Sequence, residues 1–427
     1  KNVLETMADD VTPATEGLRQ RPQATDDKVD AADKPEEKHR PARTQRCLQV
    51  AHSKPFKAGM LAIVSVTPAF GVTCALPRVL EQVGWTSSVT HFFHTFLALW
   101  LSVQFVFNFA MTQWTDPGGT AQVKPSYEVS GQFEMVLPDG QVLFYAPNYC
   151  EKCQHWKPPR THHCSICKKC ILRMDHHCPF TGNCIGMRNH GHFALMYIFA
   201  MTGLLYSLLL CVTAVINGRW AEDVQSKLAD PSSAQKAVKA AGDSWQLHLV
   251  LGPGLSGLLA QLLLKVIVYG GIEVAIQTAL TIVALIAVLI CGVQALGLVF
   301  SGTTIIEHTF PMKEYVQIQP LEPVGPRASA VYCPLGPGFY RHRWWENAKD
   351  LLGKRWWLRL LLPTRAGDVD IQPAIGPRVS EAGAKALRDR IAQVENEGVK
   401  KEVASCRDLG INPGPAKEEE PTAGPMV

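Results

Sequence analysis

Hydrophobic residues gather in a few long runs along this chain, and polar residues fill the stretches between them. Residues 56–111 contain two such runs, while residues 194–216 and 276–300 hold one each. Each run is close to the roughly 20 apolar residues that an α-helix needs to cross a bilayer. We therefore predict an α-helical polytopic membrane protein with four transmembrane helices, although the average hydropathy of the whole chain is near zero.

The flanking charges predict the orientation. Five cations precede the first run, namely Arg40, Arg43, Arg46, Lys54 and Lys57, and cations concentrate on the cytosolic side of membrane proteins. Residues 1–55 are polar and poor in aromatics, which is typical of a disordered cytosolic tail. Pro68 lies inside the first run and predicts a kink with local repair of the backbone hydrogen bonding.

A fifth apolar stretch, Leu247–Tyr269, is ambiguous because it carries Gly252-Pro253-Gly254 and Lys265. If it crossed fully, the C-terminal region would lie opposite the N-terminus. That region is basic and should be cytosolic, since it contains Arg341, Arg343, Lys349, Lys354, Arg355 and Arg359. We therefore expect Leu247–Tyr269 to lie in the far membrane interface, within a lumenal loop of residues 217–275.

The region between the second and third runs concentrates thiols and imidazoles. Seven of the chain's 13 cysteines fall between Cys150 and Cys184, as repeated C-x2-C pairs with histidines nearby. This spacing is typical of zinc sites, whereas disulfides rarely persist in the cytosol. We predict that residues 112–193 form a cytosolic cysteine-rich zinc domain of short β-hairpins, and that Phe133–Tyr145 forms a hairpin around Pro138-Asp139-Gly140.

Counting the ligands separates structure from chemistry. Eight groups fill two closed four-ligand zinc sites: Cys150, Cys153, His163, Cys164, Cys167, Cys170, His177 and Cys184. Asp175, His176 and Cys178 remain, an acid, an imidazole and a thiol side by side. This is the composition of a nucleophilic site, in which the histidine takes the thiol proton and the carboxylate orients the histidine. The alternative is two ordinary loop residues and a spare ligand.

The whole block resembles a known family. The pattern C-x2-C-x9-HC-x2-C-x2-C-x4-DHHC-x5-C-x4-N-x3-F is complete through Asn189 and Phe193, and it is similar to the cysteine-rich domain of the DHHC protein S-acyltransferases (palmitoyltransferases). The resemblance implies the four-span layout and two structural zinc ions. It also implies the ligand pairing, with Cys150, Cys153, His163 and Cys170 at one ion and Cys164, Cys167, His177 and Cys184 at the other.

The resemblance further implies an activity. Cys178 would take a long-chain acyl group from acyl-CoA as a thioester, with ping-pong kinetics, and pass it to cysteines of protein substrates at the cytosolic membrane face. Lys157, Arg160 and His162 stand where the family binds the CoA phosphates, although a solvated basic face is the alternative. The acyl chain would lie among the four helices, where Gly203 leaves room, with helix packing as the alternative role for this small residue. Family habit suggests the endoplasmic reticulum or Golgi membrane.

Residues 301–365 carry two further family-like motifs within a cytosolic C-terminal domain. Thr303-Thr304-Ile305-Ile306-Glu307 resembles the family's Thr-Thr-x-Glu motif but has one extra residue, which puts Glu307 in doubt. Asn347-x4-Leu352-Gly353 resembles the Asn-x4-aromatic-Gly motif. Nearby tryptophans mixed with cations suit a helix at the lipid headgroups or one packed on the cysteine-rich domain. Residues 366–427 should be mostly disordered, with one short helix around Leu387, Ile391 and Val394.

Two other classes of function compete with the acyltransferase. A membrane-tethered zinc module for protein interaction would not need the extra thiol of Cys178. A zinc-finger nucleic-acid binder would need a base-reading helix, which the sequence does not show, and a modest net charge of +4 gives it no support. We therefore expect no nucleic-acid partner.

Overall fold

The computed structural model describes residues 53–120, 133–217, 255–310, 314–318, 331–353, 355–365 and 377–396. The expectations for the N-terminal tail, for most of the loop before residue 255 and for the end of the chain lie outside these ranges. Within them, four helices are long and apolar enough to cross a membrane: Lys54–Val83, Ser88–Trp114, His190–Ala214 and Glu273–Ser301. The four predicted transmembrane helices are confirmed.

The first spanning helix is built from three consecutive pieces. It runs through α2 (Lys54–Phe70), a π-helical turn (Gly71–Ala75) and α3 (Leu76–Val83), with Pro68 one turn before the junction. Proline has no backbone N–H and crowds the preceding turn, so the regular hydrogen-bond ladder cannot continue unchanged. The wider π turn is the local change in backbone hydrogen bonding that we predicted from the position of Pro68.

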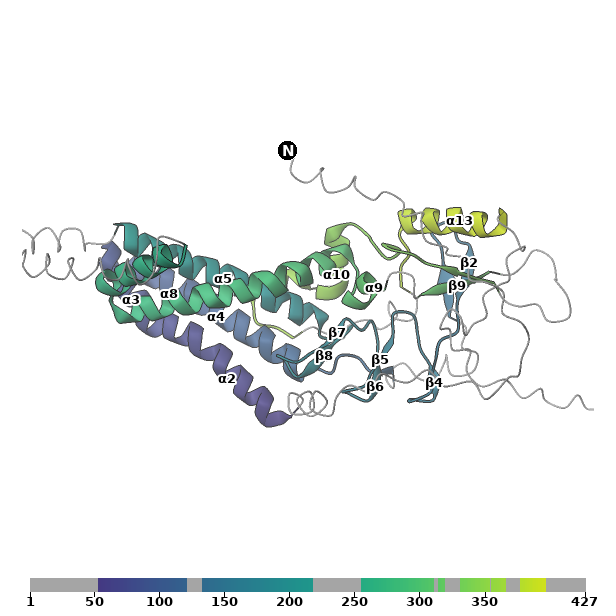
Figure 1. Ribbon diagram of the computed structural model, residues 1–427, viewed down its shortest axis with the longest axis horizontal. Helices are drawn as coiled ribbons and strands as arrows, with labels where there is room; N and C mark the ends of the chain where they lie inside the picture. The colour runs from purple at the N-terminus through teal and green to yellow at the C-terminus, as the bar shows by residue number, and fades with distance from the viewer. Residues whose placement is uncertain are drawn as a thin grey trace, which may run out of the picture. The chain divides into compact units, whose positions relative to one another are not determined.

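Three long helices pack against one another in the bundle (Figure 1). They are α4 (Ser88–Trp114), α5 (His190–Asn217) and α8 (Leu255–Ser301), and α5 contacts both of the others. Large apolar side chains such as Phe92, Val283 and Ile290 are exposed on their outer faces. That exposure suits helices whose surroundings are lipid rather than water.

Helix α8 corrects one expectation. It is continuous from Leu255 to Ser301, 47 residues, or about 70 Å at 1.5 Å per residue. Residues 255–269 therefore continue the last spanning helix and do not form a separate interfacial helix. The strong breaker Gly252-Pro253-Gly254 lies before the helix begins, and glycine inside a helix costs only about 1 kcal/mol, so Gly270 and Gly271 do not end it.

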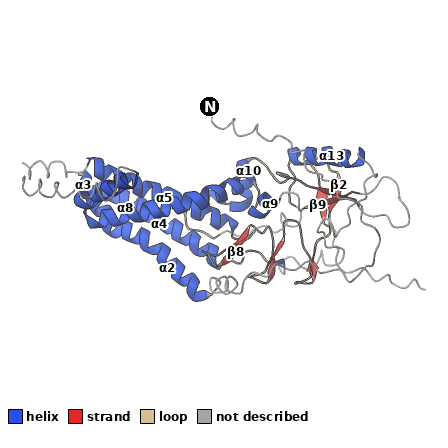
Figure 2. Ribbon diagram, in the orientation of Figure 1, coloured by secondary structure: helices blue, strands red, loops and turns tan. Residues whose placement is uncertain are grey.

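Short hairpins make up the cysteine-rich region (Figure 2). They pair β3 (Tyr149–Cys150) with β4 (His155–Trp156), β5 (His162–Cys164) with β6 (Lys169–Ile171), and β7 (His176–Cys178) with β8 (Asn183–Ile185). The hairpin predicted around Pro138-Asp139-Gly140 is also confirmed, as β1 (Glu134–Val136) and β2 (Val142–Tyr145).

That first hairpin belongs to a larger sheet which the sequence did not predict. Two strands from after the last span, β9 (Tyr315–Ile318) and β10 (Val331–Pro334), extend it in the order β1-β2-β9-β10. Helix α13 (Glu381–Asn396) packs on this sheet through Ala384 and Leu387, which are fully buried. The predicted helix around Leu387 is thus present, and it completes a core shared by distant parts of the chain.

The C-terminal segment packs back against the helices α5 and α8. Its elements are α9 (Ile305–Thr309), α10 (Trp344–Leu352) and α11 (Trp356–Leu361). The side-chain amide of Asn347 donates to the backbone oxygens of Phe300 and His342, at 2.8 and 3.0 Å. Asn347 therefore ties α10 to the end of α8, while Trp344 and Trp357 of the same segment stay exposed.

Candidate functional site

The hairpin of β7 and β8 carries the candidate site residues. Alternate residues of a strand point to opposite faces. On β7, His177 faces one way while His176 and Cys178 face the other. His177 pairs across the hairpin with Cys184, and Cys178 pairs with Asn183. The strand therefore places the candidate metal ligand, His177, on one face and the two candidate catalytic side chains, His176 and Cys178, on the other.

Neighbouring hairpins interlock through their thiols and imidazoles. The first set takes Cys150 and Cys153 from one hairpin and the cross-strand pair His163 and Cys170 from the next. The second set repeats the arrangement one hairpin further along the chain, with Cys164, Cys167, His177 and Cys184. In each set the ligand atoms all lie within 4.8 Å of one another.

The distances inside both sets fit tetrahedral zinc. Nδ1 of His163 lies 3.5, 3.2 and 3.9 Å from the sulfurs of Cys150, Cys153 and Cys170. Nδ1 of His177 lies 3.7, 3.4 and 3.5 Å from those of Cys164, Cys167 and Cys184. Zinc bonds of about 2.0–2.3 Å place ligand atoms about 3.5 Å apart. The described cysteines form no disulfide, so these residues could hold two metal ions.

The reactive hairpin is fixed to the end of α4 by one buried amide. Nδ2 of Asn183 lies 3.1, 3.2 and 2.9 Å from the carbonyl oxygens of Thr112, Gln113 and Thr115. These carbonyls belong to the last turn of the helix, where the backbone has no partner of its own. Asn183 therefore satisfies the helix end and places β7 at the mouth of the helical bundle.

Asp175 and His176 form the ordered half of the candidate catalytic trio. Nδ1 of His176 lies 2.7 Å from Oδ2 of Asp175, and Asp175 is only 3 % exposed. Burial opposes ionisation of the carboxyl, but hydrogen bonds from His176 and Ile305 hold the pKa of Asp175 below its ordinary value. A fixed carboxylate on Nδ1 directs Nε2 of the imidazole toward the thiol side.

Cys178 completes the trio at the bundle. It is 5 % exposed and packs with Phe109, Phe193 and Met196. Burial alone would raise the pKa of the Cys178 thiol, but the hydrogen bond and positive charge of His176 lower it overall. Burial likewise opposes protonation of His176, while Asp175 and Cys178 raise its pKa to about 9. The arrangement favours a thiolate beside an imidazolium, the reactive form of a cysteine nucleophile.

The Thr-Thr motif after the last span orders the backbone at the start of α9, where Ile305 bonds to Asp175. Thr304 accepts from the N–H of Glu307 at 3.3 Å and Glu307 accepts from the N–H of Thr304 at 2.9 Å, a capping box at the start of α9. The guanidinium of Arg160 donates two hydrogen bonds to the Glu307 carboxylate, of 2.6 and 2.8 Å. The extra residue in the motif does not displace Glu307, because Thr304 supplies the three-residue spacing that a capping box needs.

The three cations expected at the CoA phosphates are placed differently. Lys157 and His162 are half-buried, whereas Arg160 is 6 % exposed. The guanidinium of Arg160 bonds to Glu307 and to the carbonyl oxygen of Gly302, and it lies 4.4 Å from the ring centre of Tyr340. This packing ties Arg160 to protein groups and does not fit the expectation of a phosphate contact.

Tyr340 also belongs to a buried network that sequence reasoning missed. Its hydroxyl donates to Glu314 at 2.8 Å, and Glu314 accepts from the N–H of Arg160 at 2.7 Å. Burial and the charge of Glu307 raise the pKa of Glu314 to about 7. The only signal was an isolated acid at the start of a short apolar strand, which is too weak to identify.

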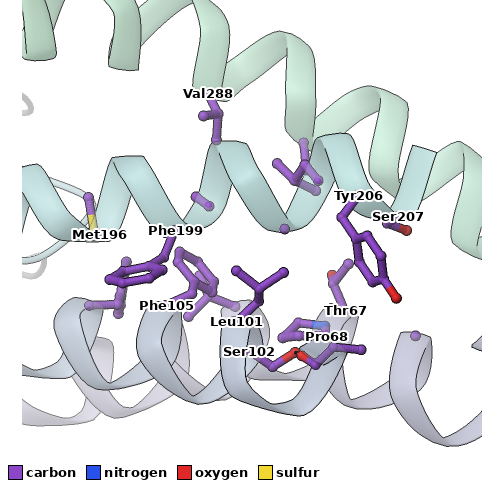
Figure 3. A pocket seen from close by; sticks show the side chains of 18 of the residues that line it. Thr67, Pro68, Leu101, Ser102, Phe105, Met196, Phe199, Tyr206, Ser207 and Val288 are labelled. Carbon is purple, nitrogen blue, oxygen red and sulfur yellow. Dashed lines mark hydrogen bonds between the residues drawn. The ribbon is translucent and has the colours of Figure 1, made fainter. Parts of the chain in front are cut away.

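An apolar cavity opens beside Cys178 and runs between the helices (Figure 3). Its volume is about 420 Å³, and Phe105, Phe199 and Gly203 are among the residues that line it. A Cβ at Gly203 would meet only Leu101, at 3.9 Å. Cys178, the candidate nucleophile, thus lines an apolar space large enough for a long hydrocarbon chain.

Comparison with known proteins agrees with this geometry. Residues 143–312 match the family model described as DHHC palmitoyltransferase. The chain is 36 % identical over 115 residues to "Probable protein S-acyltransferase 16" of Arabidopsis thaliana, covering 26 % of this chain and 38 % of that protein. It is 35 % identical over 147 residues to "Palmitoyltransferase ZDHHC16" of Bos taurus, covering 34 % of each chain. The alignments thus span little more than a third of the length of these relatives.

Proposed function

We propose that the protein, whose residues 143–312 match the DHHC palmitoyltransferase family model, is a membrane-embedded protein-cysteine S-acyltransferase. The observation that carries the proposal is the 2.7 Å bond between His176 and Asp175 beside a thiol at the mouth of an apolar cavity. A scaffold that only bound zinc would need neither the thiol of Cys178 nor the cavity. A nucleic-acid binder would also need neither this thiol nor an apolar cavity.

In the first half of the proposed reaction, Cys178 takes the acyl group from a long-chain acyl-CoA. His176 removes the thiol proton, the Cys178 thiolate attacks the thioester carbonyl, and the carbon–sulfur bond to CoA breaks. His176 returns its proton to the departing CoA thiolate. The cavity holds the acyl chain, and Lys157 and His162 are the proposed phosphate contacts, with Arg160 left out for the reason given above.

In the second half, a cysteine of a protein substrate replaces CoA. His176 takes the proton of the incoming thiol, whose thiolate attacks the acyl group on Cys178. The Cys178 thiolate leaves and regains its activated form. We infer that the substrates are membrane-associated proteins that present a cysteine at the cytosolic face, and that the enzyme resides in the endoplasmic reticulum or Golgi membrane.

Zinc contributes rigidity in this proposal. Bound at the two Cys/His sets, the ions would cross-link the three hairpins, since four-ligand sites are closed and structural. The protein's own groups then hold β7 in place: Asn183 on α4, and the capping box of α9 behind Asp175. A rigid strand keeps His176 and Cys178 oriented before substrate arrives.

The test is incubation of the full-length protein in detergent with radiolabelled palmitoyl-CoA. Wild type should acquire a hydroxylamine-sensitive label and release CoA, and Cys178→Ser should do neither. Equal labelling of the two proteins would move the nucleophile elsewhere. Gly203→Tyr serves as a second probe, because a bulky side chain there should shift acyl-chain preference toward shorter donors while leaving zinc content unchanged.

A further inference from the structure

The end of the cavity farthest from Cys178 carries polar side chains among apolar ones such as Leu76 and Leu210. Met196, which packs with Cys178, lies at one end of the close-up, and Tyr206 and Ser207 lie at the other (Figure 3). Gln277 also lines the cavity and hydrogen-bonds to Ser207. A cavity that served only hydrocarbon would be expected to end in apolar side chains, so this change of chemistry requires an explanation.

One amide at this end lacks a full set of partners. The Gln277 amide nitrogen, Nε2, lies 3.3 Å from the hydroxyls of both Ser207 and Thr281. Its oxygen, Oε1, is buried without a hydrogen-bond partner, and Gln277 is 5 % exposed. An unsatisfied buried carbonyl is costly. Because Ser207 and Thr281 can donate as well as accept, the amide can turn over, but one of its polar atoms stays unpaired either way.

The amide is also held in place by its neighbours. A Cβ on Gly71 would come within 3.1 Å of the Gln277 amide nitrogen, so the side chain lies directly against the π turn of the first span. Ser207 and Thr281 bond to each other at 3.1 Å and fix the opposite side. The Gln277 side chain, which lines the cavity, is therefore held between the π turn and the Ser207–Thr281 pair.

The reach from the nucleophile suits an acyl chain. Met196 and Ser207 lie on α5 about 16 Å apart along its axis, at roughly 1.5 Å per residue. A chain that fills one leaflet of a bilayer spans half of the hydrocarbon core, or about 15 Å. The end of a long-chain acyl group on Cys178 would therefore arrive at Ser207 and Gln277.

We propose that Ser207 and Gln277, held in place by Thr281, form a subsite for a hydroxyl group at the ω end of a long-chain acyl donor. This inference rests on the proposed acyltransferase function and names a substrate class for it. A hydroxyl both donates and accepts, so it satisfies the Gln277 amide in either orientation. A methyl terminus leaves the amide unpaired.

The test compares acyl-enzyme formation from 16-hydroxyhexadecanoyl-CoA and hexadecanoyl-CoA in the full-length protein. Replacing Gln277 by Leu removes the unpaired amide with little change in volume. The ratio of kcat/KM for the hydroxylated over the plain donor should fall about tenfold in Gln277→Leu, the scale of one lost hydrogen bond. Ser102→Ala is the matched control, because Ser102 lines the cavity but its hydroxyl bonds to the carbonyl of Ala98. The control should keep the wild-type ratio.

An unchanged ratio in Gln277→Leu would overturn the subsite, since it would mean that water satisfies the amide. If neither donor labels wild type, the proposed function fails. The subsite can then still be tested through the binding of free fatty acids. In that case the melting temperature of the Cys178→Ser protein is measured with 16-hydroxyhexadecanoic acid and with hexadecanoic acid. The hydroxylated acid should stabilise this protein more, and the difference should vanish when Gln277→Leu is added. Equal stabilisation by the two acids would also overturn the subsite.

Discussion

The backbone N–H of Ile305 donates a 2.7 Å hydrogen bond to Oδ1 of Asp175. The other oxygen of Asp175 bonds to His176, so both carboxylate oxygens have fixed partners. One of these partners comes from the segment that follows the last spanning helix. The proposed catalytic trio is therefore held from two directions, by its own hairpin and by the start of α9.

Removing the support behind Asp175 should slow acylation. Glu307→Ala breaks the capping box and leaves Arg160 without its carboxylate, so Ile305 should no longer be held against Asp175. We expect the rate of acyl-enzyme formation to fall about tenfold, in line with the loss of a cap and its ion pair, with little change in KM. Stopped-flow measurement of CoA release checks this. Glu381→Ala, at the exposed start of α13, is the control, and an equal rate in Glu307→Ala would refute the supporting role.

Zinc content should be two ions per chain. Cys184→Ser removes one ligand of the second set, so the purified variant should retain about one ion. Because Cys184 pairs with His177 beside the nucleophile, this variant should also lose acylation. Cys74→Ser, at an exposed position on the first span, should keep both ions and full activity. Atomic emission analysis of the purified proteins decides, and a wild-type value well below two would contradict the assignment.

Stability should carry a pH dependence from Glu314. Burial raises the pKa of this carboxyl from 4.5 to about 7 in the folded protein. Below about pH 4.5 it is protonated in both states; as pH rises toward 7, the unfolded chain releases the proton that the folded chain still holds. Glu314 therefore destabilises the native state progressively across this window.

Glu314→Gln removes that titration while keeping an acceptor for Arg160 and Tyr340. The melting temperature of wild type should fall relative to the variant between pH 4.5 and 7, and the gap should level off above pH 7. Differential scanning calorimetry over this range provides the measurement. A gap that stays constant with pH would show that Glu314 ionises normally.

The joint between β7–β8 and α4 should depend on Asn183. Asn183→Asp replaces an amide donor with a carboxylate facing the carbonyl oxygens of Thr112, Gln113 and Thr115. We expect a loss of about 2–3 kcal/mol in unfolding free energy, because the Thr115 carbonyl loses its donor, the Thr112 and Gln113 carbonyls each lose one of two donors, and a charge is buried. Thermal unfolding measures this, with Gln141→Ala in the exposed β1–β2 turn as the control. A melting temperature equal to that of wild type would remove Asn183 from the account.

Features set by local spacing were predictable from the sequence. The four spans follow from runs of apolar residues, and the two metal sets follow from C-x2-C pairs whose hairpins interlock in chain order. Neighbouring residues of a strand face opposite sides, so His176 and His177 can take the two separate roles predicted from the motif.

Features that depend on distant partners were not predictable. Arg160 looked like a phosphate contact because the sequence shows its charge but not Glu307, its partner from beyond the last span. The strands Tyr315–Ile318 and Val331–Pro334 are too short to identify alone, and they form only because the β1–β2 hairpin offers an edge. Residues 255–269 were separated from the last span because composition cannot show whether a helix continues through a pair of glycines.

The central claim is that one sulfur among the chain's 13 cysteines carries the acyl group. The most direct measurement is peptide mass spectrometry of the wild-type protein after brief incubation with palmitoyl-CoA and rapid acid quench. We predict a thioester-linked acyl group on Cys178, absent after hydroxylamine treatment and absent in Cys178→Ser. An acyl group on Cys291 of the same cavity or on a metal-site thiol, with Cys178 unmodified, would contradict the account.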